Sequence, residues 1–202
     1  GLSEKEAKSR AESYGTNELE EGKKKSLLQK FFEQFKDLMI IVLLVAAAVS
    51  AIVPNETGHR EWVDAIIILA VVLINAVMGV IQESKAEEAI EALREMSTPD
   101  ANVLRDGHPL TIASSQIVPG DVVLLEAGDI VPADIRLIEV SSLKIEEAAL
   151  TGESVPVDKK LTVLVEDEVP LGDRVNMAYS NSNVTYGRGR GIVVNTGMNT
   201  EV

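Results

Sequence analysis

The sequence predicts a mixed fold, in which a two-helix transmembrane hairpin with a helical stalk is joined to an all-β domain and preceded by short N-terminal helices. Two blocks without charged side chains, Leu38 to Asn55 and Ala65 to Gln82, predict the hairpin. Each block holds about 18 residues, and a helix needs about 17 to 25 to cross the hydrocarbon layer of a membrane. After Pro99 the chain changes to short runs of Val, Ile and Leu separated by Gly, Pro and Asp, which is typical of a compact β domain.

Composition limits the classes of function. The chain has 202 residues, of which 46% are hydrophobic, and this argues against wholesale disorder. Its 32 acidic and 19 basic residues give a formal net charge of -13, which opposes binding to nucleic acid. There is no cysteine for a disulfide or a thiolate metal site, and the two histidines, His59 and His108, are too far apart in sequence to suggest zinc.

Residues 1–37 are the predicted N-terminal cytoplasmic helices. Residues 3–6 have the spacing of a capping box and Gly15 is a stop signal, so a helix is expected over 4–14. Residues 26–29 repeat the capping spacing before an apolar stripe at helical period. This stripe either lies along the membrane surface and leads into the first span, or packs into a protein core.

Residues 38–55 are the first predicted span, 56–64 the extracytoplasmic loop, and 65–98 the second span with its stalk. Two buried helices of a soluble domain are the alternative, but a chain of this length could hardly bury both on all sides. Lysines are frequent before the first span, while the loop has only Arg60, so the positive-inside rule places both chain ends in the cytoplasm. Trp62 is expected at the outer interface.

The helical pattern continues past the second span as a stalk, because one face stays apolar while the other carries glutamates, and Pro99 is expected to end it. Residues 99–202 form the predicted β-rich domain. Its candidate strands are the runs ANVLR, PLTIA, DVVLLE, DIRLIEV, SLKIEEAAL, LTVLV and GIVVN.

Two clusters of turn residues separate some of these runs, Pro119 to Asp121 and Gly128 to Asp134. Proline fixes φ, glycine permits positive φ and aspartate can bond to the backbone, so both clusters are expected to be turns. Asp121, Asp129 and Asp134 are therefore expected to cap turns, although they would suit a hard cation if the fold brought them together.

A third cluster, Thr151-Gly152-Glu153-Ser154 followed by Pro156, suggests chemistry. Its carboxylate stands between two hydroxyl residues and beside a glycine, so a loop tip can present it close to another backbone. At hydrogen-bond distance from a water molecule, the Glu153 carboxylate would act as general base for in-line attack on a phosphoryl group. A short motif also occurs by chance, and an ordinary turn is the alternative.

The order of these features resembles the actuator region of P-type cation-transporting ATPases, above all the calcium-pump branch. The membrane hairpin, the stalk, PGD, GDxVPAD and TGESxPV follow one another as they do in that family. The resemblance covers nearly the whole chain, because three further segments are similar to the family: SYGTNEL, NAVMGVIQESKAEEAIEAL and NMAYSNSNVTYGRGRGIVVNTGMNTEV.

The resemblance implies that the β-rich domain is an actuator domain, a distorted jelly roll or double-stranded β-helix, which rotates during transport. Glu153 would position the water that hydrolyses an aspartyl phosphate, with Thr151, Gly152 and Ser154 shaping the loop that docks on the phosphorylation site. Glu83 matches an acidic position near the cytoplasmic ion entrance of calcium pumps, or else is a carboxylate on the helix surface at the interface.

The implied cofactors are ATP and Mg²⁺, bound by the phosphorylation and nucleotide-binding domains of the same full-length protein, because the chain has neither DKTGT nor a GxxxxGK loop. Those domains and the lipid bilayer are the expected partners, and Ca²⁺ is the expected cargo. The fragment alone is not expected to hydrolyse ATP. It is expected in the bacterial plasma membrane. A Na⁺/K⁺- or H⁺-type pump and a non-catalytic membrane-anchored β binding domain stay open as alternatives.

Overall fold

The computed structural model describes residues 1–54 and 62–202, which form two compact units. We call them the β-rich unit, residues 1–20 with 98–202, and the helical unit, residues 21–97. Each unit is described by itself.

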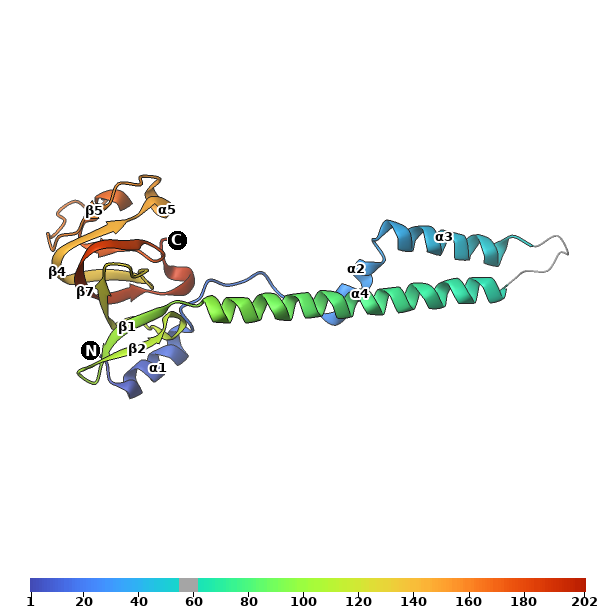
Figure 1. Cartoon of the computed structure of the whole chain (residues 1–202), viewed down its shortest axis with the longest axis horizontal. Helices are drawn as coiled ribbons and strands as arrows, with labels where there is room; N and C mark the ends of the chain where they lie inside the picture. Colours follow the sequence, from blue (N-terminus) through green and yellow to red (C-terminus); the bar gives the residue numbers. More distant parts are fainter. Residues whose placement is uncertain (55–61) are drawn as a thin grey trace. The chain divides into compact units, whose positions relative to one another are not determined.

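The β-rich unit is a seven-stranded sheet with helix α1, Glu4–Tyr14, beside it (Figure 1). Its strands are β1 Asp100–Arg105, β2 His108–Ala113, β3 Val122–Glu126, β4 Asp134–Glu146, β5 Val157–Asp158, β6 Met177–Ala178 and β7 Asn183–Asn195. The short helices of this unit are η1 Ser114–Gln116, α5 Ala148–Thr151, η2 Leu171–Asp173 and η3 Gly197–Asn199. The strands are ordered β2-β1-β3-β7-β4-β5 with β6 beside β4, and neighbouring strands pair antiparallel.

The core of the β-rich unit lies on the inward face of the sheet. Side chains of a strand alternate between two faces, and in β1 Ala101, Val103 and Arg105 are buried while the residues between them are less so. The long central strands β4 and β7 bring further apolar side chains to this core, among them Ile135, Leu137, Leu143, Ile145, Val184 and Val193. The strands run so close together that a side chain at Gly187, where φ is 72°, would meet the Ser142 carbonyl oxygen at 2.2 Å.

Two runs that were expected to be separate strands form one strand, and a third run is in no strand. The runs DIRLIEV and SLKIEEAAL belong to one continuous strand, β4, which keeps its pairing through bulges and a positive φ of 51° at Ser142, and the last residues of the second run form α5. The run LTVLV, residues 161–165, is in no strand. Val163 and Val165 are 72% and 93% exposed, because no neighbouring strand covers them.

The predicted turns are confirmed. The Asp121 carboxylate accepts from the Val118 N–H at 3.0 Å, and the Asp129 carboxylate accepts from the Glu126 N–H at 3.0 Å. Asp134 is buried and accepts instead from two backbone N–H groups that are distant in sequence. Among the described residues these acids do not gather into a cluster able to hold a metal ion.

The first 20 residues pack with the sheet, although sequence reasoning grouped them with the rest of 1–37. Helix α1 begins and ends as predicted, with the Ser3 hydroxyl accepting from the Glu6 N–H and with Gly15 as its C-cap. The Asn17 side chain then donates to the carbonyl oxygens of Ser114 and Pro132 and accepts from the Gly197 N–H. These contacts join the N-terminal segment to three distant parts of the β-rich unit.

The helical unit consists of α2 Leu27–Gln34, α3 Leu38–Ile52 and α4 Trp62–Ser97, with α3 alongside α4 (Figure 1). Helix α4 is long and apolar enough to cross a membrane, and it runs on without a break to the residue before Thr98-Pro99, as the stalk prediction required. Most of the apolar side chains of this unit are exposed.

The predicted span 38–55 is longer than the helix found there. Helix α3 has 15 residues, which corresponds to about 22 Å at 1.5 Å per residue, short of a hydrocarbon core of about 30 Å. It begins at the predicted residue, where the Asp37 carboxylate caps it by accepting from the Met39 N–H at 2.8 Å, but its last helical residue is Ile52. Together α2 and α3 pass the length test, but they are bent by 69°. Asn55 and the predicted loop as far as Glu61, including Arg60, lie outside the described residues.

Helix α2 is held on α4 by polar side chains. The Ser26 hydroxyl caps α2 by accepting from the Gln29 N–H, as predicted. The Lys30 ammonium, although it belongs to a buried residue, donates to the Glu87 carboxylate at 2.6 Å. In the apolar stripe of α2, Leu27, Leu28 and Phe32 stay exposed, so only part of the stripe is used for packing.

Candidate functional site

The TGES turn, residues Thr151 to Ser154, lies in the connection between β4 and β5. These strands are antiparallel neighbours, with Lys144 opposite Asp158 and Ile145 opposite Val157. Both ends of the connection are therefore held in the sheet. What lies between them is the single helical turn α5 and an extended return segment.

The turn is built by a helix that stops at a glycine. Gly152 has φ 78° and ψ -2°, the left-handed conformation that glycine adopts without strain, and its N–H donates to the Ala148 carbonyl oxygen at 2.9 Å. The Thr151 hydroxyl donates to the Glu147 carbonyl oxygen at 3.1 Å and accepts from the Glu153 N–H at 3.3 Å. Thr151 thus links the last helical turn to the residue that carries the carboxylate.

The four predicted residues are together at the tip of this connection. Gly152, Glu153 and Ser154 are exposed, and the next residue, Val155, is 76% exposed. Thr151 is half-buried and faces η2, where a side chain added to Gly172 would touch its methyl group. The carboxylate of Glu153 is therefore presented outward on a turn whose inner side is packed.

Two charged residues beneath the turn were not identified from the sequence as site residues. Glu147 precedes α5 and Lys159 follows β5, and their side chains form a hydrogen-bonded ion pair with no solvent exposure on either side. Burial raises the pKa of Glu147, against the attraction of Lys159, and burial lowers the pKa of Lys159, against the attraction of Glu147. No local pattern in the sequence marks this pair, because its members are brought together by strand pairing.

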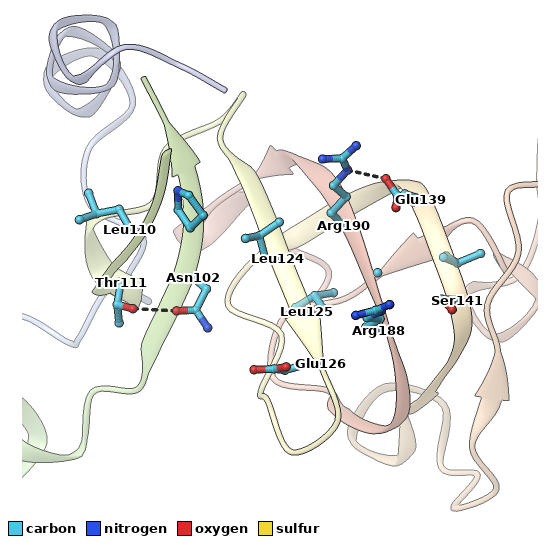
Figure 2. A pocket seen from close by; sticks show the side chains of 13 residues that line it. Asn102, Leu110, Thr111, Leu124, Leu125, Glu126, Glu139, Ser141, Arg188 and Arg190 are labelled. Carbon is cyan, nitrogen blue, oxygen red and sulfur yellow. Dashed lines mark hydrogen bonds and ion pairs between the residues drawn. The ribbon is translucent and has the colours of Figure 1, made fainter. Parts of the chain in front are cut away.

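A hollow on the sheet does not include the turn. It has a volume of about 720 Å³ and lies over β1, β2, β3, β4 and β7, between Thr111 at one side and Ser141 at the other (Figure 2). On the side formed by β4 and β7, Arg190 pairs with Glu139 at 2.7 Å, as Figure 2 shows. Because no TGES residue lines it, this hollow is not the predicted catalytic site.

Glu83, the candidate ion-entrance residue, lies on α4 in the helical unit. Its carboxylate accepts from the Gln34 side-chain amide of α2 at 3.4 Å. A side chain at Gly79, one turn earlier on α4, would clash with the same Gln34 at 2.3 Å. Glu83 is thus engaged with α2.

Two family models match the chain. Residues 95–202 match the P-type ATPase actuator domain, and residues 1–50 match the N-terminus of cation transporters and ATPases. The first match contains the whole sheet and the TGES turn. The second contains α1, α2 and most of α3.

Curated relatives align over essentially the whole chain. The chain is 51% identical to "Calcium-transporting ATPase 1" of Bacillus cereus over 100% of its length, and 49% identical to "Calcium-transporting ATPase" of Bacillus subtilis over 99%. It is 50% identical, again over 100%, to "Probable cation-transporting ATPase F" of Mycobacterium tuberculosis. In each case it spans 22% of the relative's length.

Proposed function

Because this chain belongs to the P-type cation-transporting ATPases and carries their actuator domain, we propose that it is part of an ATP-driven calcium pump in which Glu153 promotes hydrolysis of an aspartyl phosphate. One observation carries the proposal: the Glu153 carboxylate is exposed at the tip of a turn that is held in the sheet at both ends. Two of the relatives just compared are named as calcium-transporting, which supports Ca²⁺ as the cargo.

The proposed chemistry is general-base catalysis. A water oxygen attacks phosphorus in line, the bond from phosphorus to the aspartate oxygen breaks, and the water gives a proton to the Glu153 carboxylate. The products are inorganic phosphate and the free aspartate. Thr151 fixes the backbone of Glu153 through its hydroxyl, Gly152 supplies the turn, and Ser154 borders the carboxylate at the docking surface.

We assign ATP and Mg²⁺ to parts of the full-length protein outside these 202 residues. The described residues contain no cluster of three metal-ligating side chains, and the sequence has no phosphorylation or nucleotide-binding motif. The phosphorylation and nucleotide-binding domains are thus the proposed partners of the TGES turn. This part of the pump would couple phosphate hydrolysis to the movement of its membrane helices.

The membrane placement is also a proposal. We assign α3 and α4 to a two-span hairpin in the lipid bilayer, in the plasma membrane with both chain ends cytoplasmic, because their large apolar side chains are exposed in the described part of the chain. We keep the boundaries 38–55, 56–64 and 65–98 for the spans and their loop, and a distorted jelly roll for residues 99–202. Glu83 would then lie near the cytoplasmic ion entrance.

The test is the decay of the phosphorylated intermediate in the full-length protein. After labelling with [γ-³²P]ATP and a chase, Glu153→Gln should slow decay by about 10²- to 10⁴-fold, the usual contribution of general acid-base catalysis. Glu166→Gln, at an exposed carboxylate on a neighbouring loop, is the matched control and should leave the rate unchanged. Equal decay in wild type and Glu153→Gln would refute the role of Glu153.

ATP-driven uptake of ⁴⁵Ca²⁺ into vesicles tests whether Ca²⁺ is the cargo. Uptake of Na⁺ or H⁺ instead would refute the assignment of Ca²⁺.

A further inference from the structure

The Glu147–Lys159 ion pair at the base of the TGES loop has few hydrogen bonds for a buried pair. Both side chains of Glu147 and Lys159 are fully buried, and the Lys159 ammonium donates to only one carboxylate oxygen, Oε1. The second oxygen, Oε2, has no hydrogen-bond partner among the described residues. A buried carboxylate with an unpaired oxygen costs free energy, so stability alone does not account for this pair.

The backbone of the same two residues holds the two ends of the loop. The Glu147 carbonyl oxygen accepts from the Leu150 N–H at 2.9 Å and the Thr151 N–H at 3.0 Å, and also from the Thr151 hydroxyl. The Lys159 N–H donates to the Leu143 carbonyl oxygen of β4 at 2.8 Å. The ion pair therefore joins the residue on which the TGES turn is built to the residue that directly follows the returning strand β5.

We propose that Glu147 and Lys159 are positioning residues, whose buried ion pair clamps the two ends of the TGES loop and so fixes where the Glu153 carboxylate meets its water. This rests on the proposed function of Glu153. The clamp acts at a distance from the reacting atoms, since both side chains are buried while Glu153 is exposed. Attack in line on phosphorus is sensitive to such placement, because a shift of about 1 Å in a catalytic group can cost about 10²-fold in rate.

The experiment uses the full-length protein and separates phosphorylation from dephosphorylation. In Lys159→Met, labelling by [γ-³²P]ATP should persist, while decay of the phosphoenzyme should slow by about 10- to 100-fold. Hydrogen exchange of the amides of residues 148–156 should become faster. Val103→Ala, a core truncation on β1, is the matched control: it weakens the same unit, but it should change neither the decay nor exchange in the loop.

A double variant separates positioning from stability. Replacing both charges, in Glu147→Leu/Lys159→Met, removes the unpaired buried charge and should recover the stability that the single variant loses. The proposal expects decay to stay slow, because the clamp is still missing. A double variant with wild-type decay would overturn the proposal.

A charge-retaining variant covers the case in which the others fail to fold. Glu147→Asp keeps both charges but shortens the acid by one methylene, and decay should slow by about tenfold or more if the length of the clamp matters. Unchanged decay would overturn the proposal. Glu153→Gln is measured alongside: if only Glu153→Gln slows decay, this inference fails and the proposed function stands, whereas if neither does, the proposed function fails as well.

Discussion

Two buried ion pairs in the described part of the β-rich unit differ in how fully their polar atoms are hydrogen-bonded. Arg105 and Asp121 meet in two hydrogen bonds, at 3.0 and 2.8 Å, and further backbone groups of Gln116 and Val118 complete them. The Glu147–Lys159 pair has one contact and an oxygen without a partner in the described structure. The first pair closes a turn, and the second lies at the base of the TGES loop, for which we propose contact with another domain.

This difference suggests how to distinguish a structural from a functional charge pair. A fully paired site stabilises the fold and nothing more is needed to account for it. An incompletely paired site costs free energy, and some other property must offset that cost. Here the exposed Glu153 lies between the two members of the pair in the sequence. The comparison therefore predicts that the Arg105–Asp121 site, which we call the Arg105 corner, and the Glu147–Lys159 site respond differently to the same kind of substitution.

The largest effect is expected at the Arg105 corner, and on stability alone. Arg105→Met leaves the fully buried Asp121 carboxylate with only the Val118 N–H, and removing one partner of a buried pair costs about 3–5 kcal/mol. Hydrogen exchange over residues 100–126 of the full-length protein measures this loss. The first-order decay of the phosphoenzyme that does form should equal that of wild type. Slower decay would show that the Arg105–Asp121 pair also affects dephosphorylation, and that the two ion pairs do not differ in this respect.

A smaller effect is expected from two glycines with the same backbone conformation. Gly152 and Gly107 have φ of 78° and 76°, and a methyl group at either would meet nothing within 4 Å. Alanine at each position should therefore cost a similar amount, about 1–2 kcal/mol for a left-handed residue. Local hydrogen exchange measures both costs.

Only Gly152→Ala should also slow phosphoenzyme decay, because only this glycine sets the direction of the Glu153 carboxylate. Gly107→Ala, in the hairpin between β1 and β2, is the matched control for strain. If both variants slow decay equally, the rate reports the stability of the whole unit rather than the geometry of the turn.

Much of the fold was predictable because its signals are local. Ser3, Ser26 and Gly15 mark helix ends through bonds to residues three or four positions away, and Pro99 follows the end of α4. The TGES turn was found in the same way, from adjacent letters. Strand LTVLV was predicted wrongly because a strand also requires a partner, and β composition alone does not supply one.

The ion pair under the turn could not be found in this way. Glu147 is one of two acids in the run KIEE, and Lys159 is one of two lysines after Asp158. They meet because β5 returns antiparallel beside the end of β4, a long-range feature that no spacing rule expresses. Similarly, Asn17 joins distant segments through its single side-chain amide, and no local signal places residues 1–20 with the sheet.

The smallest effect is expected from pH, and it sharpens the comparison further. The pKa of Glu147 is raised above its ordinary 4.5 by burial, so just above pH 4.5 the folded protein keeps a proton that the unfolded chain releases. Stability therefore falls as pH rises through that window. The pKa of Lys159 is lowered below its ordinary 10.5 by burial, so just below pH 10.5 the unfolded chain holds the extra proton and stability rises with pH.

Between these two windows the wild type is therefore at its least stable relative to Glu147→Leu/Lys159→Met, which lacks both titrations. The difference in melting temperature between the two proteins, followed against pH, should be largest near neutrality and shrink toward either end. Arg105 provides the contrast, since its hydrogen bond to Asp121 raises its pKa and it keeps its charge throughout. A melting difference that does not change with pH would mean that the Glu147–Lys159 pair is as well accommodated as Arg105–Asp121, and its burial would then need no functional explanation.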